Sequence, residues 1–128
     1  MKLISMLAGA GLLLAGCVET DAGSDGFVRV TDEAAFRAAV VGRDLVAANG
    51  GNGNFFRLNA DGSVSGNYGR GALQGSWSFE DGYWCRTWTA GLKPESLGSD
   101  CQLAELAPGQ VALTRNRGEG NRGVFDIR

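Results

Sequence analysis

The chain has 128 residues, of which 44% are hydrophobic and 20% charged, and its formal net charge at pH 7 is −2. This length suits one domain, and so large an apolar share argues against intrinsic disorder. A nucleic-acid-binding protein is disfavoured, because such proteins bind through clustered positive charge. The chain has no histidine, the commonest general base and metal ligand, so we expect no enzyme, no metal site and no cofactor.

The chain begins with an apolar segment that ends in a cysteine. Lys2 precedes the apolar residues 3–15, and the segment closes with Leu14-Ala15-Gly16-Cys17. This pattern resembles the signal peptide and lipobox of bacterial lipoproteins. The run is about thirteen residues long, which suits a signal peptide and is shorter than the roughly twenty residues of a membrane-spanning helix. The resemblance implies that residues 1–16 are removed and that lipid is attached to Cys17.

The segment after the lipobox predicts where the protein resides. Residues 17–26 are small, polar and acidic, so we expect a lipidated tether that precedes a single β-rich domain over residues 27–128. Val18 and Glu19 follow the cysteine, and neither is the aspartate that retains some lipoproteins at the inner membrane. By analogy with those sorting rules, we expect the periplasmic face of the outer membrane.

A short helix is predicted near the start of the domain, after an extended segment over residues 27–30. Thr31 offers an N-cap hydroxyl, and Asp32 and Glu33 place negative charge in the first turn, where the helix dipole favours it. Residues 34–41 propagate the helix from that first turn until Gly42, and this is the one convincing helix of the sequence.

From residue 44 onward, short apolar stretches alternate with glycine turns at intervals of about ten residues. Asp61-Gly62 and Asp81-Gly82 are strong hairpin signals, and Pro108-Gly109 marks another turn. The predicted fold is mainly β: an antiparallel meander that forms a small lipocalin-like barrel or a curved sheet, with one short N-terminal helix. The expected strands are residues 44–48, 54–59, 63–68, 73–80, 83–89, 101–106, 110–115 and 123–127.

The three cysteines divide into one lipid site and one pair. With Cys17 assigned to lipid, Cys85 and Cys101 remain, in a compartment where disulfides persist. A redox or metal role is the alternative, but the chain has neither a Cys-x-x-Cys motif nor a histidine. We therefore predict a structural disulfide between Cys85 and Cys101.

A two-residue turn at Asp81-Gly82 would set the register of the hairpin around it. That register pairs Gly75 with Trp88, Trp77 with Arg86, and Phe79 with Trp84 on one face. This aromatic face should be the buried one. Trp77, Trp84, Arg86 and Trp88 are thus a candidate core or ligand-binding cluster. Arg86 is either a structural pin, held by an indole ring or a buried carboxylate, or the contact for an anionic ligand inside the barrel.

Several motifs occur together in the body of the chain: Asp61-Gly62-x-x-x-Gly66, Gly75-x-Trp77, Glu80-Asp81-Gly82-Tyr83-x-Cys85-Arg86 and Asp100-Cys101-Gln102. With this combination, residues 42–128 resemble a group of small secreted alphaproteobacterial proteins of unknown function. The resemblance joins the cysteine pair to the aromatic hairpin and implies no activity.

These features predict a lipid-anchored cell-envelope protein with a structural or binding role. Its partners would be the membrane, through the lipid, and either a protein or a small hydrophobic or anionic ligand, but not nucleic acid. The alternative is a periplasmic protease inhibitor, because some such inhibitors are also small tryptophan-containing β-barrels with one disulfide.

The lipobox yields the first testable prediction. A Cys17→Ser variant should keep residues 1–16 and incorporate no fatty acid, because it lacks the thiol that receives the lipid. Metabolic labelling with palmitate and the mass of the membrane-associated protein measure both effects. Normal acylation of this variant would contradict the assignment.

Overall fold

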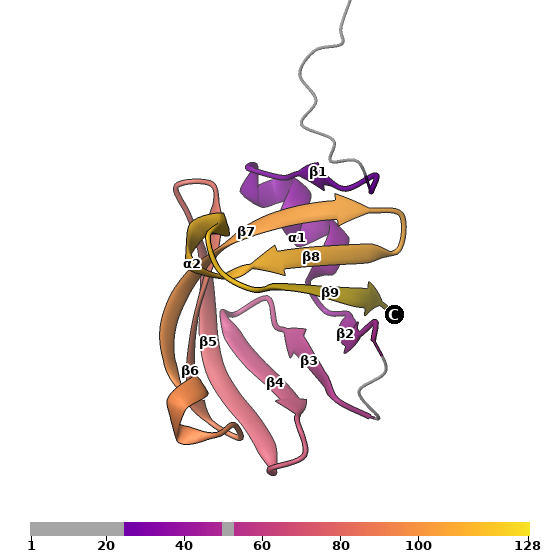
Figure 1. Cartoon of the computed structure of the whole chain (residues 1–128). Helices are drawn as coiled ribbons and strands as arrows, with labels where there is room; N and C mark the ends of the chain where they lie inside the picture. Colours follow the sequence, from indigo (N-terminus) through magenta and orange to yellow (C-terminus); the bar gives the residue numbers. More distant parts are fainter. Residues whose placement is uncertain (1–24, 50–52) are drawn as a thin grey trace, which may run out of the picture.

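The computed structural model describes residues 25–49 and 53–128, so the lipobox, Cys17 and most of the predicted tether lie outside the described residues. The strands are β1 Val28–Arg29, β2 Asp44–Ala47, β3 Phe55–Leu58, β4 Ser63–Asn67, β5 Ala72–Glu80, β6 Tyr83–Ala90, β7 Gly98–Ala107, β8 Gln110–Thr114 and β9 Arg122–Ile127. From β2 to β9, each strand pairs antiparallel with the next one in sequence, and β9 pairs with β2 (Figure 1). The predicted barrel is confirmed as a closed eight-stranded meander.

One helix, α1 (Glu33–Val40), packs its apolar face into the barrel. Phe36 and Val40 point inward and are fully buried in the core. The prediction that Thr31 caps this helix is wrong. Asp32 has the extended backbone of a cap residue, and its carboxylate accepts a hydrogen bond of 3.0 Å from the Ala35 amide.

The short N-terminal helix is as predicted, and two short helical turns follow it along the chain. They are η1 (Pro94–Ser96), between β6 and β7, and α2 (Arg115–Gly118), between β8 and β9. Asn116 and Arg117 in α2 have φ angles of 53° and 51°, so this turn follows no right-handed helical pattern that a sequence would reveal. The Asp100 carboxylate holds the turn by accepting 3.2 Å hydrogen bonds from the Asn116 amide.

The predicted register of the β5–β6 hairpin is confirmed. Asp81 and Gly82 have φ angles of 54° and 81°, which both central positions of a type I′ turn require. Glu80 pairs with Tyr83, Trp77 with Arg86, and Gly75 with Trp88. A Cβ atom on Gly75 would lie 2.3 Å from the Thr87 carbonyl oxygen, so only glycine fits this close approach of two strands.

The two ends of the barrel differ. Short turns join β3 to β4, β5 to β6 and β7 to β8 at one end, and α1 covers the same end. Longer connections join β6 to β7, through η1, and β8 to β9, through α2, from the opposite ends of these strands. The α2 turn folds back along the barrel wall, and its Arg117 guanidinium lies 5.1 Å from the centroid of the Tyr83 ring. The barrel is thus plugged at the α1 end and framed by loops at the opposite end.

The predicted disulfide is confirmed. Cys85 of β6 and Cys101 of β7 are directly opposite in the ladder, and their sulfur atoms are bonded. The bond therefore links β6 and β7, the two wall strands that the η1 segment connects. Among the helices of the described residues, none is long and apolar enough to cross a membrane.

The disulfide should contribute much of the stability of this small domain. Replacing both Cys85 and Cys101 by alanine should lower the free energy of unfolding by about 2 to 5 kcal/mol, because the bond restricts the unfolded chain. Urea unfolding followed by tryptophan fluorescence measures this loss. A reducing agent should destabilise the unsubstituted domain and leave the double variant unchanged, and two reactive thiols in the native protein would refute the bond.

Candidate functional site

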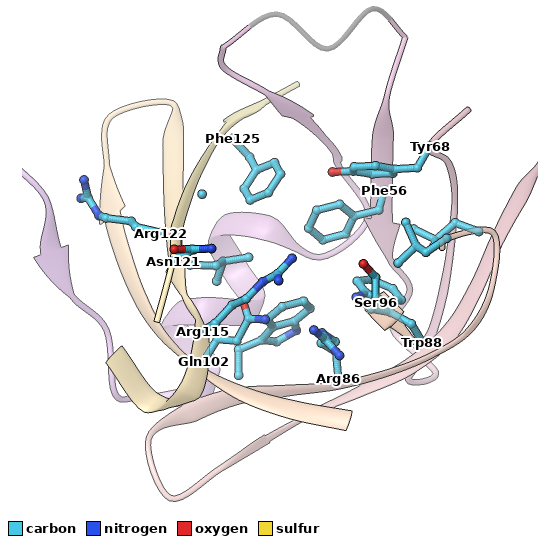
Figure 2. A pocket seen from close by; sticks show the side chains of 15 residues that line it. Phe56, Tyr68, Arg86, Trp88, Ser96, Gln102, Arg115, Asn121, Arg122 and Phe125 are labelled. Atoms are coloured by element: carbon cyan, nitrogen blue, oxygen red, sulfur yellow. The ribbon is translucent and has the colours of Figure 1, made fainter. Parts of the chain in front are cut away.

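A cavity of about 310 Å³ lies in the loop-framed half of the barrel. Figure 2 looks into it, with α1 crossing behind the pocket. Its wall comes from β3, β5, β6, β7, β8 and β9, and η1 and α2 contribute Ser96 and Arg115. The interior of the barrel is therefore packed at the α1 end and hollow at the other.

Aromatic rings form much of the cavity wall. The ring of Phe56 lies 6.0 Å from Trp84, 5.8 Å from Trp88 and 5.1 Å from Phe125, measured between centroids. Tyr68 lies beside Phe56, at 6.3 Å. Burial raises the pKa of Tyr68 to about 12, so its phenol stays a neutral hydrogen-bond donor at physiological pH.

Arg86 brings a guanidinium into this aromatic site. Arg86 is only 7% exposed, and Figure 2 shows its side chain pointing into the pocket. Nη1 donates a 2.7 Å hydrogen bond to the Gly98 carbonyl, and the guanidinium carbon lies 5.4 Å from the centroid of the Trp88 ring. Nε is buried and has no hydrogen-bond partner among the described residues. The group is therefore held in place with part of its donor capacity unused.

The charge of Arg86 is only partly compensated. Burial lowers its pKa, the carboxylate of Asp100 opposes this effect, and the guanidinium of Arg115 adds to it. Asp100 is the register partner of Arg86, yet among the described residues the two form no ion pair. The Asp100 carboxylate instead accepts hydrogen bonds from Gln102 Nε2, at 3.1 Å, and from the Asn116 amide.

Two more arginines line the cavity, and they differ in direction. Arg115 is exposed overall, and in Figure 2 its guanidinium reaches into the pocket. Arg122 points away from the pocket in the same view and forms ion pairs with Asp25, at 2.9 Å, and Glu105, at 3.4 Å. Positive charge in the pocket thus comes from Arg86 and Arg115.

The structure divides the cluster predicted from the hairpin. Trp84, Arg86 and Trp88 line the cavity, and Trp84 is 1% exposed with its indole Nε1 lacking a partner among the described residues. Trp77 is buried on the same barrel face but belongs to the packed end. Its Nε1 donates to the Asn59 carbonyl at 2.9 Å, and its ring lies 6.1 Å from Phe36. Trp77 is therefore a core residue.

Sequence reasoning missed several residues of the site, among them Phe56, Tyr68, Gln102, Arg115 and Phe125. Gln102 could have been predicted from the sequence. If Cys85 lies opposite Cys101 in an antiparallel pair, the next residues along, Trp84 and Gln102, are also opposite each other. The others lie far apart in sequence, and only closure of the barrel brings them together. Within the described part of the chain, no group of three or more histidine, cysteine, aspartate or glutamate side chains is arranged to hold a metal ion.

Substitutions of Arg86 separate packing from charge. Arg86→Ala should lower the free energy of unfolding by about 2 kcal/mol or more, because it removes the packed stem and leaves the Gly98 carbonyl without its donor. Arg115→Ala, in an exposed turn, should cost less than about 0.5 kcal/mol. Arg86→Met also leaves the Gly98 carbonyl without its donor but keeps the apolar stem and removes a poorly compensated buried charge, so it should be clearly more stable than Arg86→Ala.

Urea unfolding of the three variants, followed by tryptophan fluorescence, measures these differences. If Arg86→Met were as unstable as Arg86→Ala, the guanidinium would be fully paired within the fold. If both were silent, Arg86 would not lie in the barrel interior.

Comparisons of the chain with models of protein families, with curated proteins and with solved structures found no match. The resemblance to small secreted alphaproteobacterial proteins therefore stays a prediction, and any function must be argued from the site.

Proposed function

We propose that this protein is a lipid-anchored cell-envelope protein with a binding role, and that its barrel takes up a small ligand in the loop-framed cavity. The cavity is the observation that carries this proposal. Small-molecule sites typically occupy about 300 to 1,000 Å³ and combine apolar walls with a few polar groups. This cavity, of about 310 Å³, has aromatic walls and a few polar lining residues, among them Arg86, Gln102 and Arg115.

Location in the cell envelope is supported by two independent features. The lipobox ending at Cys17 resembles that of lipoproteins, and the Cys85–Cys101 bond is consistent with a place outside the cytoplasm, where disulfides persist. Two or more acyl chains on the cysteine would make anchoring stable, because each buried methylene contributes roughly 0.8 kcal/mol.

Binding is favoured over catalysis by the chemistry of the cavity wall. Among the described residues that line it, none carries a carboxylate, an imidazole or a thiol. Its hydroxyl groups, on Ser96 and Tyr68, therefore have no neighbouring side chain in the wall to act as a general base. The wall offers hydrogen-bond donors and apolar contacts, which suit recognition.

A neutral fluorescent probe tests the cavity. The domain over residues 25–128, which contains the complete barrel, should bind one equivalent of N-phenyl-1-naphthylamine. Probe emission should rise as water is excluded, and emission from Trp84 and Trp88 should fall by energy transfer. Fluorescence titration and the stoichiometry at saturation measure this binding.

Two matched variants show whether the probe enters the cavity. Ser96→Phe places a ring in the wall and should weaken binding at least about tenfold, because the ring occupies ligand volume. Glu95→Phe adds the same ring one residue away, at an exposed position outside the wall, and should bind as the unsubstituted domain does. Absence of binding, or equal binding by both variants, would refute the proposal, and inhibition of a periplasmic protease by the domain without probe binding would favour the alternative function.

A further inference from the structure

We propose that the cavity binds a small amphipathic anion, a molecule with a carboxylate that contacts Arg86 and an apolar, preferably aromatic, body that lies among the rings. This inference rests on the proposed function and specifies the class of ligand. It is carried by a buried guanidinium with unused donors inside an aromatic cavity.

Within the described part of the chain, no carboxylate forms an ion pair with the guanidinium of Arg86. Among the described residues, only its Nη1 has a hydrogen bond, and that bond goes to a neutral carbonyl. Asp100, the register partner of Arg86, is engaged by Gln102 and by the backbone of α2. A buried charge is unfavourable unless it is paired, so a ligand carboxylate would supply what the fold does not.

Neighbouring donors point to the same kind of ligand. The guanidinium of Arg115 reaches into the same cavity from α2 (Figure 2), so a second cationic donor would face the ligand. A planar guanidinium matches the geometry of a carboxylate better than a lysine ammonium does. Since no carboxylate side chain lies in the described wall, no group there would repel an anion.

The rest of the cavity would hold the apolar body. Phe56, Tyr68 and Phe125 lie across the pocket from Arg86 in Figure 2, so head and body would contact different parts of the wall. The volume of about 310 Å³ suits a molecule of one or two fused rings, or a short aliphatic chain, and is too small for a peptide segment or a phospholipid.

Isothermal titration calorimetry with a matched pair of ligands tests the inference. The pair is 2-naphthoate and 2-naphthalenemethanol, which share the ring system and differ in charge. The domain over residues 25–128 should bind the carboxylate at least about tenfold more tightly than the alcohol, because a hydrogen bond to a charged group adds to the shared apolar contacts.

Three variants assign that preference to individual arginines. Arg86→Met should abolish the preference, so that the two ligands bind with equal affinity through the apolar wall that both contact. Arg115→Gln should reduce the preference in part. Arg122→Gln is the matched control: it removes a cavity-lining arginine whose guanidinium is committed to Asp25 and Glu105, and the preference should remain.

The outcomes separate this inference from the proposed function. Equal affinities for the two ligands, or a preference that survives Arg86→Met, would overturn the anion site while leaving a binding cavity. Failure of both ligands, together with failure of the neutral naphthylamine probe, would overturn the proposed function itself.

Discussion

The two-residue turn at Asp81-Gly82 is the constraint on which the interior of the barrel depends. Side chains alternate between the faces of a strand, so a slip of one residue would move Trp84, Arg86 and Trp88 to the outside. The turn excludes this slip, because both of its residues adopt the positive φ angles of a type I′ turn. The Cys85–Cys101 bond holds β6 against β7 in a register that agrees with the turn. Turn and disulfide together direct the aromatic rings and one guanidinium into the barrel.

The core packed around α1 and the cavity lie at opposite ends of the barrel. At the α1 end, Phe36 and Val40 fill the barrel, and Trp77 satisfies its indole nitrogen through Asn59. At the other end, the wall surrounds a cavity, and the buried Nε1 of Trp84 and Nε of Arg86 have no hydrogen-bond partner among the described residues. A cavity and a poorly compensated charge both lower stability, and sites that bind ligands often carry such a cost.

The start of the described chain is tied to the rim of the cavity. Asp25, a residue of the predicted tether, pairs with Arg122 at the start of β9, and the Arg122 guanidinium also lies 4.8 Å from the ring of Phe27. This ion pair keeps a third cation directed out of the pocket. Surface ion pairs contribute little to stability, about 0 to 1 kcal/mol. The main consequence of the pair is therefore electrostatic: it leaves Arg86 and Arg115 as the cations that face the cavity.

The sequence by itself determined the β-rich meander, the cysteine pair and the inward face of the β5–β6 hairpin. These features depend on local chemistry: glycine turns at regular intervals, two cysteines left after the lipobox, and a two-residue turn that sets a register. The sequence did not reveal the N-cap at Asp32, because the adjacent Thr31 is an equally suitable cap residue. It did not reveal the left-handed turn at Asn116 either, because a tertiary contact to Asp100 holds that turn. Only the tertiary structure decided that Trp77 is core while Trp84 and Trp88 line a cavity. Closing a barrel brings side chains from distant strands to one point, and the position of α1 determines which end is filled.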